Sequence, residues 1–285
     1  MALRRTTDPD EARRIVRQWR SEGLTVGFVP TMGALHEGHL SLVEASTREC
    51  DRTVLSIYVN PTQFGPDEDL EDYPRRLDED CRRAGQHGVD LVFHPADAAM
   101  YPEGFCTYVV QEGLTDVLEG EFRPTHFRGV LTVVCKLLNS VPATRAYFGH
   151  KDFQQSVVVR RMVRDLNIPV EIRVMPTVRE EDGLAVSSRN EYLDPDQRRQ
   201  ATCLYRALTE AQRLYEEGES DADALRRAMR EIIDAAPPAR PDYVEIVDRD
   251  TLEPVATVTD RAVAALAVHV GETRLIDNMP FGADG

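Results

Sequence analysis

The stretch between residues 25 and 42 most restricts the fold that this chain can adopt. Its apolar run 26–29 is short enough for a buried strand, and Pro30 ends that strand because proline has no backbone N–H. Gly33 permits a tight turn, and from Leu40 onwards apolar residues recur at the spacing of one helix face. The sequence therefore predicts a strand, a glycine-containing loop and a helix.

Two histidines stand at the entrance of this helix, in a His-Glu-Gly-His motif over residues 36–39. Because His36 and His39 are three residues apart, they share one side of the first turn and can donate to the same anion. The helix N-terminus adds unpaired N–H groups and a partial positive charge, and Gly38 leaves room for a nucleotide. A zinc half-site is one alternative interpretation, but no third ligand follows at metal-site spacing. The other alternative is that two surface histidines occur here by chance. We therefore favour a phosphate-binding site.

Composition narrows the class of protein. The 285 residues suffice for one large or two moderate domains, and the formal net charge of −15 argues against a general nucleic-acid binder. No apolar run is long enough to span a bilayer, and no apolar signal-peptide core follows the N-terminus. The five cysteines are scattered and show no C-x-x-C pair, which favours free thiols. We expect a cytoplasmic protein that does not act at membranes.

Helix and strand patterns alternate through residues 1–177. We expect helices at 9–20, 73–87, 130–138 and 158–166, and strands at 53–59, 89–93, 145–148 and 170–174. Such alternation with short links predicts an α/β fold with a Rossmann-like parallel sheet wrapped by helices. No G-x-G-x-x-G motif is present, which disfavours the dinucleotide-binding version.

Two amides follow the predicted strand 53–59. Asn60 and Gln63 offer both donors and acceptors at a strand end, which suits a hydroxyl or carboxyl substrate, although Asn60 alone could mark a plain turn. The acidic residues 67–72 are expected to form a solvated rim or mobile lid. Residues 101–128 look irregular, and His126 within them has either a structural or a catalytic role.

A second loop of this kind occurs at residues 148–155. Gly149 permits a turn, Asp152 can cap the next helix, and Gln155 is expected one turn beyond Lys151 on the same face. Lys151 is one of only two lysines, and a cation at a helix entrance is disfavoured unless an anion binds there. The other lysine, Lys136, is expected to extend into solvent. The scarcity of lysine is compatible with a GC-rich genome, a high-salt cytoplasm or both.

Residues 178–285 are expected to form a smaller α+β domain that acts as a lid. The polar stretch 179–183 is typical of a hinge. Ser187, Ser188 and Arg189 then form a compact set of donors for phosphate oxygens. Further on, helices are expected at 204–215 and after a capping box at 220–223, with strands near 243–247 and 262–268.

The His-x-Gly-His stretch resembles the signature of the nucleotidylyltransferase superfamily. The whole set of motifs resembles one family within it, the pantothenate synthetases (pantoate–β-alanine ligases), in order and over nearly the whole chain. The segments that carry this resemblance are residues 29–39, 59–65, 126–129, 148–155, 182–190 and 274–278.

The resemblance implies an AMP-forming carbon–nitrogen ligase of pantothenate biosynthesis. ATP and (R)-pantoate would give pantoyl adenylate and pyrophosphate, and β-alanine would then displace AMP to give pantothenate. Magnesium would be carried by the ATP phosphates, since the sequence shows no dedicated metal cage. The family likeness also implies a homodimer.

Site residues follow from the same resemblance, position by position. The implied catalytic residues are His36, His39, Lys151 and Arg189, with His39 the proton donor as pyrophosphate leaves. Gln63, Gln155 and Asn60 would bind pantoate or β-alanine. The implied ATP-binding residues are Met32, Gly33, His36, His39, Gly149, His150, Lys151, Asp152, Val178, Val186, Ser187, Ser188 and Arg189.

One departure and two alternatives qualify this interpretation. His150 stands where the family usually has glutamate, which puts a peripheral contact in doubt. A nucleotidylyltransferase acting on a phosphorylated alcohol is the alternative enzyme, but the neutral Gln63 and Gln155 suit a phosphate poorly. A nucleotide-sensing or scaffold protein without catalysis is disfavoured by four intact residues: His36, His39, Lys151 and Arg189.

Overall fold

A computed structural model describes residues 3–66 and 68–282. The chain folds into two compact units. The first comprises residues 1–116, 123–149 and 158–175, and the second comprises residues 117–122, 150–157 and 176–285. The second unit therefore takes in two short segments, 117–122 and 150–157, that interrupt the first unit in the sequence.

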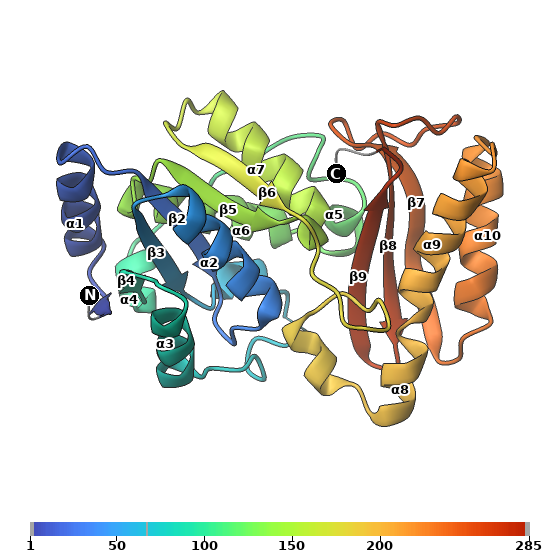
Figure 1. Cartoon of the computed structure of the whole chain (residues 1–285), viewed down its shortest axis with the longest axis horizontal. Helices are drawn as coiled ribbons and strands as arrows, with labels where there is room; N and C mark the ends of the chain where they lie inside the picture. The colour runs from blue at the N-terminus through green and yellow to red at the C-terminus, as the bar shows by residue number, and fades with distance from the viewer. Residues whose placement is uncertain (1–2, 67, 283–285) are drawn as a thin grey trace. The chain divides into compact units, whose positions relative to one another are not determined.

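The first unit is built on a six-stranded parallel sheet in the order β1-β4-β3-β2-β5-β6 (Figure 1). Its strands are β1 (Arg4–Thr6), β2 (Val26–Thr31), β3 (Arg52–Ile57), β4 (Leu91–Phe93), β5 (Arg145–Gly149) and β6 (Glu171–Met175). Together with the small antiparallel sheet of the second unit, this confirms the predicted fold class.

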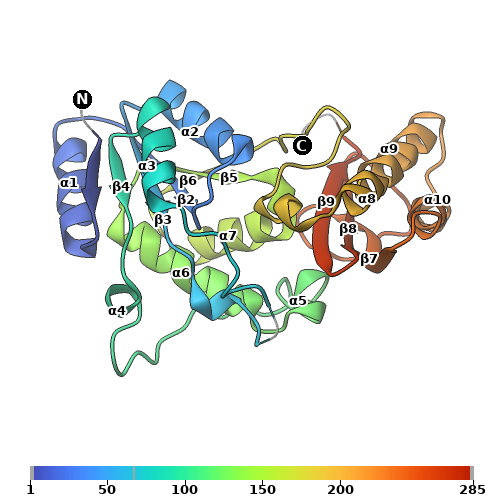
Figure 2. The same ribbon diagram turned by 90° about the horizontal axis from the view of Figure 1, so that it is seen from below.

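Helices cover both faces of this sheet. Figure 2 shows α2 (Glu37–Glu49) and α3 (Leu77–Gln86) on one side, and α6 (His126–Ser140) with α7 (Phe153–Asp165) on the other. One apolar core joins α1 (Pro9–Ser21), α6 and residues 158–163 of α7 to the sheet, and a separate core joins α2 and α3 to it. The short helix α4 (Asp97–Met100) follows β4.

The order of the strands places two of the predicted motifs at one point of the sheet. From β2 the chain continues through α2 to β3 on one side, whereas β5 pairs with β2 on the other side. Ligands in open α/β sheets bind outside the carboxyl ends of strands where the order reverses in this way. The loop after β2 carries the double-histidine motif, and β5 ends at Gly149.

The second unit contains the antiparallel sheet β7 (Ala239–Asp248), β8 (Ala262–Val270) and β9 (Thr273–Pro280). The helices α9 (Cys203–Glu216) and α10 (Ala222–Asp234) lie side by side on this sheet (Figure 1) and share its apolar core. The unit also contains the short helices α5 (Glu119–Phe122) and α8 (Pro195–Gln200).

Several predicted boundaries are corrected. The helix expected at 73–87 begins only at Leu77, and the cap expected at Ser220 is Asp221, whose carboxylate accepts the N–H groups of Asp223 and Ala224. The strands β1 and β9 and the helix α8 were not predicted. Within the described part of the chain, no helix is long and apolar enough to cross a membrane.

Candidate functional site

The loop after β2 is held by an aspartate that the sequence analysis did not identify. Asp80, on α3, is 2% exposed and accepts the main-chain N–H groups of Ala34 at 2.9 Å and Leu35 at 2.8 Å. Gly33 has a φ of +87°, a conformation that favours glycine. Burial raises the pKa of the Asp80 carboxyl, although the hydrogen bonds from Leu35 and Ala34 lower it. Asp80 thus fixes the turn that leads into α2.

His36 and His39 lie together at the start of α2. Their rings are stacked, with centroids 4.0 Å apart and 24° between the planes. The main-chain N–H of His36 donates to His39 Nδ1 across 3.4 Å. When Nδ1 accepts, the neutral ring carries its proton on Nε2. In this tautomer His39 Nε2 is a donor, and the ring lies at a helix N-terminus, where an anion is stabilised.

The amide of Asn60 has a defined orientation. Its Oδ1 accepts from the hydroxyls of Tyr101 at 2.7 Å and Thr62 at 3.0 Å. Its Nδ2 donates to Gln63 Oε1 at 3.0 Å and to the main-chain oxygen of Gly129 at 3.3 Å. A flipped amide would place its NH2 group against the main-chain N–H of Thr62 and its oxygen against the carbonyl oxygen of Gly129. Asn60 is 1% exposed and is fixed as a donor to Gln63.

The orientation of Asn60 determines what Gln63 offers to a substrate. Because Gln63 Oε1 already accepts from Asn60, Gln63 presents its Nε2 as a donor. Nε2 lies 3.2 Å from Met32 Sδ, a weak acceptor that a carboxylate or hydroxyl oxygen can replace. Gly129 allows this arrangement, since a Cβ at that position would lie 2.3 Å from the main-chain oxygen of Thr62. Met32 and Gln63, predicted from separate motifs, are therefore in contact.

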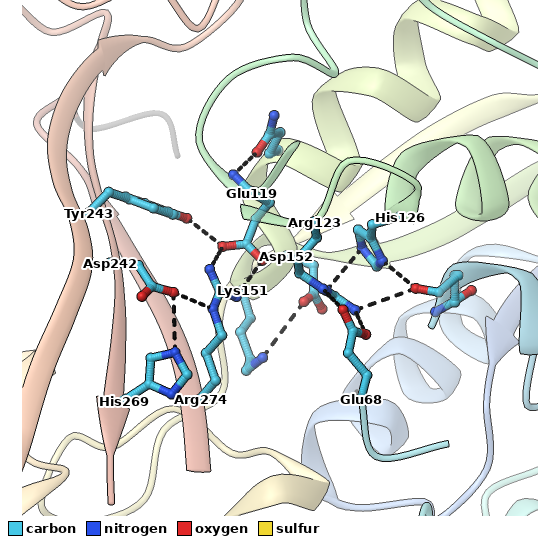
Figure 3. Close-up of polar contacts among 12 residues, drawn as sticks. Glu68, Glu119, Arg123, His126, Lys151, Asp152, Asp242, Tyr243, His269 and Arg274 are labelled. Carbon is cyan, nitrogen blue, oxygen red and sulfur yellow. Dashed lines mark hydrogen bonds and ion pairs between the residues drawn. The ribbon is translucent and has the colours of Figure 1, made fainter. Parts of the chain in front are cut away.

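The main-chain carbonyl of Gln63 is held by two basic side chains (Figure 3). His126 Nδ1 lies 3.0 Å from this oxygen and Arg123 Nη2 lies 3.5 Å from it. Arg123 also binds both carboxylate oxygens of Glu68, at 2.8 and 2.5 Å. His126 thus has the structural contact that was one of its two expected roles. The expectation of a solvated acidic segment is wrong for Glu68, and Asp67 lies outside the described residues.

The second unit carries a further group of predicted residues. His150, Lys151 and Asp152 form the 3₁₀ turn η2, directly after Gly149 at the end of β5. Lys151 Nζ lies 3.7 Å from Asp152 Oδ1, and the lysine side chain is 21% exposed. The helix α7 begins immediately after this turn, and Gln155 lies half-buried in its first turn.

The predicted phosphate-binding segment lies in the second unit as one closed loop. The N–H of Val186 donates to the main-chain oxygen of Val178 at 3.0 Å. Ser187 is the N-cap of the 3₁₀ turn η3 (Ser188–Tyr192), and its hydroxyl accepts from the Arg189 N–H at 3.3 Å. The Ser187 hydroxyl and the Arg189 N–H are thus held by a contact within the loop.

Lys136 does not extend into solvent as expected. Its ammonium lies 4.8 Å from the ring centroid of Phe105 and 5.8 Å from that of Tyr101, within the range of cation–π attraction. Lys136 therefore packs against aromatic rings of the first unit.

Comparisons with known proteins identify the family of this chain. The family model described as pantoate-beta-alanine ligase matches residues 4–280. The chain belongs to this family. The pantothenate synthetase of Moorella thermoacetica is 57% identical over 267 residues, which is 94% of each chain, and that of Pelotomaculum thermopropionicum is 54% identical over 272 residues, 95% of this chain and 96% of the relative.

Solved structures of the family have the same fold. Pantothenate synthetase from Thermus thermophilus superposes with a TM-score of 0.93 at 48% identity, covering 98% of this chain and 99% of that one. The enzyme from Francisella tularensis, solved with β-γ ATP and β-alanine, gives a TM-score of 0.81 at 31% identity, covering 98% of each chain. The predicted family and the predicted ligase of pantothenate biosynthesis are confirmed.

The structure adds residues that sequence analysis did not assign to the site. Asp80 could have been noticed as an acid on the apolar face of α3, beside Cys81 and Ala84. Tyr101 had no such indication, because its contact with Asn60 joins residues 41 positions apart. Arg179 likewise had no indication in the sequence, because its partner Asp277 lies 98 positions away.

Proposed function

We propose that the residues described above catalyse the family reaction in two chemical steps. In the first, a pantoate carboxylate oxygen attacks the α-phosphorus of ATP, the bond to the β-phosphate oxygen breaks, and pyrophosphate leaves. In the second, the amine of β-alanine attacks the acyl carbon of pantoyl adenylate, loses a proton and displaces AMP. The first step needs in-line positioning and neutralisation of charge more than a strong base.

The orientation of the Gln63 amide is the observation that carries this assignment. An outward Nε2 donor suits an acceptor such as a pantoate hydroxyl or carboxylate oxygen. Asn60 supports this pantoate contact, and Gln155 is assigned to the same substrate. A phosphorylated alcohol would instead require cations at these positions.

ATP is assigned to the remaining predicted residues. His36 and His39 contact its phosphates, and His39 Nε2 supplies a proton or hydrogen bond as pyrophosphate leaves. Lys151, Ser187, Ser188 and Arg189 neutralise phosphate charge. The remaining contacts to the nucleotide are assigned to Met32, Gly33, Gly149, His150, Asp152, Val178 and Val186.

Magnesium is proposed to be carried by the ATP phosphates. Among residues 3–66 and 68–282, no three His, Cys, Asp or Glu side chains come together as a metal site, and Mg²⁺ is commonly held by substrate phosphates. It would add positive charge beside the leaving pyrophosphate.

Three further expectations belong to the proposal. Residues 178–285 are proposed to close as a lid, because the mixed anhydride must be kept from water. The chain is proposed to be a cytoplasmic homodimer. Light scattering of the purified protein would test the dimer.

Exchange of labelled pyrophosphate into ATP tests the assigned reaction order. Exchange should require pantoate and should not require β-alanine. Exchange that occurs only when β-alanine is present would refute the two-step scheme, and exchange supported by other hydroxy acids would refute the assigned substrate.

A further inference from the structure

One motif of the family resemblance received no role from the sequence. Residues 274–278 lie in β9, and three of their side chains are polar although the strand belongs to the core sheet. Each of these polar side chains binds a segment that is distant in sequence. β9 therefore does more than complete the sheet.

Asn278 holds the turn that carries Lys151. Asn278 is 3% exposed, and its Nδ2 donates to the main-chain oxygens of His150 and Lys151, both at 2.9 Å. A flipped amide would place its oxygen against these two carbonyl oxygens, so the orientation is fixed. The backbone of η2 is consequently bound to β9 at two successive residues.

Asp277, the preceding residue, holds the loop that leads to Arg189. Its carboxylate is 1% exposed and binds Arg179 through two hydrogen bonds, Nη1–Oδ2 at 2.6 Å and Nη2–Oδ1 at 3.0 Å. Arg179 Nη1 also donates to the Gly183 carbonyl at 3.0 Å, and its guanidinium lies 4.7 Å from the ring centroid of Tyr205. A bidentate, stacked arginine is restricted in orientation. The stretch 179–183, expected as a hinge, is thus fastened within the second unit.

The two anchoring side chains act from opposite faces of one strand. Consecutive residues of a strand point to opposite faces, and β9 pairs with β8 in regular register through both residues. Asp277 lies on the face of Leu275, which packs in the core with α9. Asn278 lies on the other face, the face of Arg274.

We propose that Asp277 and Asn278 are positioning residues for adenylation, which hold the Lys151 turn and the 178–189 loop in fixed places on β9 so that both can act on the ATP phosphates. The inference rests on the proposed phosphate roles of Lys151 and Arg189. Misplacement by about 1 Å can cost about 10²-fold in rate. A rigid common base for two segments that are distant in sequence prevents such misplacement.

The same sheet offers a matched control. Arg274 binds the carboxylate of Glu119 through Nη1–Oε2 at 2.7 Å and Nη2–Oε1 at 2.8 Å, and Tyr243 donates to Glu119 Oε1 at 2.9 Å (Figure 3). These contacts hold residues 117–122, which carry no predicted ATP-binding residue. Tyr243→Phe therefore removes a buried hydrogen bond of the same sheet without touching either phosphate-binding segment.

The test compares Asn278→Asp with Tyr243→Phe. The new carboxylate would face two carbonyl oxygens, so single-turnover formation of pantoyl adenylate should fall about 10²-fold and the KM for ATP should rise. The reaction of supplied pantoyl adenylate with β-alanine should be unchanged. Lower pH should restore part of the lost adenylation, because a protonated carboxyl can donate one hydrogen bond. Arg179→Lys, which keeps the charge and loses the fork, should impair the same step.

Equal losses in both steps, or an equal loss in Tyr243→Phe, would show that Asn278 has only a structural role. An unchanged adenylation rate in Asn278→Asp would also overturn the inference. If Asn278→Asp does not fold, Asn278→Ser replaces it, because serine offers one neutral donor. The same two steps are then measured, and the same results would overturn the inference. Wild-type protein without pantoate-dependent exchange would instead refute the proposed function, so the two failures are distinguishable.

Discussion

The Tyr101 hydroxyl donates to Asn60 Oδ1 at 2.7 Å and so supports the amide orientation in which Asn60 Nδ2 faces Gln63. The tyrosine thus acts on Gln63 through an intermediate side chain. It favours the orientation in which Gln63 offers an N–H to a substrate. With the proposed role of Gln63 in pantoate binding, Tyr101 would influence that binding through Asn60.

Tyr101→Phe should raise the KM for pantoate severalfold and leave the KM for ATP unchanged. Thr62 still donates to Asn60 Oδ1 at 3.0 Å, so only part of the constraint is lost, and one hydrogen bond contributes about 0.5–1.5 kcal/mol. Initial-rate kinetics with each substrate varied would measure the effect. Tyr108→Phe is the control, because its ring lies under Arg128 at 3.6 Å and keeps that contact. Equal changes for both variants would contradict the argument.

His39→Ala should slow the first step by about 10²–10⁴-fold, the usual contribution of a general acid. His39→Gln retains an N–H near the position of Nε2 but cannot transfer a proton at neutral pH. We expect it to restore ATP binding more than it restores the rate. Equilibrium binding of ATP and single-turnover adenylation, measured on both variants, separate the two contributions. Near-normal turnover of His39→Ala would exclude the assigned role.

Glu68 should make stability depend on pH. Burial raises the pKa of its carboxyl, but the hydrogen bonds and charge of Arg123 outweigh this, and the pKa lies below its usual 4.5. The ion pair therefore stabilises the folded state above about pH 4.5, and this contribution is lost as the pH falls through the lowered pKa. Denaturant unfolding should show wild type more stable than Glu68→Gln at about pH 6, with the difference shrinking towards about pH 3. The exposed Glu103→Gln should show no such trend.

The predictable part of the molecule is the part encoded by local patterns. The parallel sheet follows from apolar runs and helical spacing, and the stacking of His36 on His39 follows from their separation by three residues. The three-residue strand β1 is too short to give a pattern of its own. Strand β9 was missed because Arg274, Asp277 and Asn278 interrupt its apolar character.

Those interruptions have long-range causes. Arg274 binds Glu119 across 155 positions, and Asn278 binds the His150 carbonyl across 128 positions. No periodicity within β9 can reveal such partners. The sequence therefore identifies the groups assigned to the ligands, whereas the residues that orient them become visible only in the folded chain.

The two lysines provide the last prediction. Lys136 lies against Phe105, where arginine would keep the cation–π contact and the charge. Lys151 lies in a tight 3₁₀ turn next to Asp152, whose carboxylate is 3.7 Å from its ammonium. Lysine offers a compact, rotatable point charge, whereas the planar fork of arginine is bulkier and prefers two parallel acceptors. Only the second position should therefore distinguish lysine from arginine.

We expect Lys151→Arg to lower single-turnover formation of pantoyl adenylate substantially, although the charge is kept, and Lys136→Arg to change it little. The physical reason is that phosphate oxygens that shift towards the transition state can be followed by a rotatable ammonium more readily than by a fixed fork. A double-mutant cycle with Asp152→Asn separates a direct effect on phosphate from a disturbed ion pair: if the pair were the cause, Lys151→Arg would cause no further loss when position 152 is already asparagine. Equal, near-wild-type rates for the two single variants would mean that Lys151 acts through its charge alone.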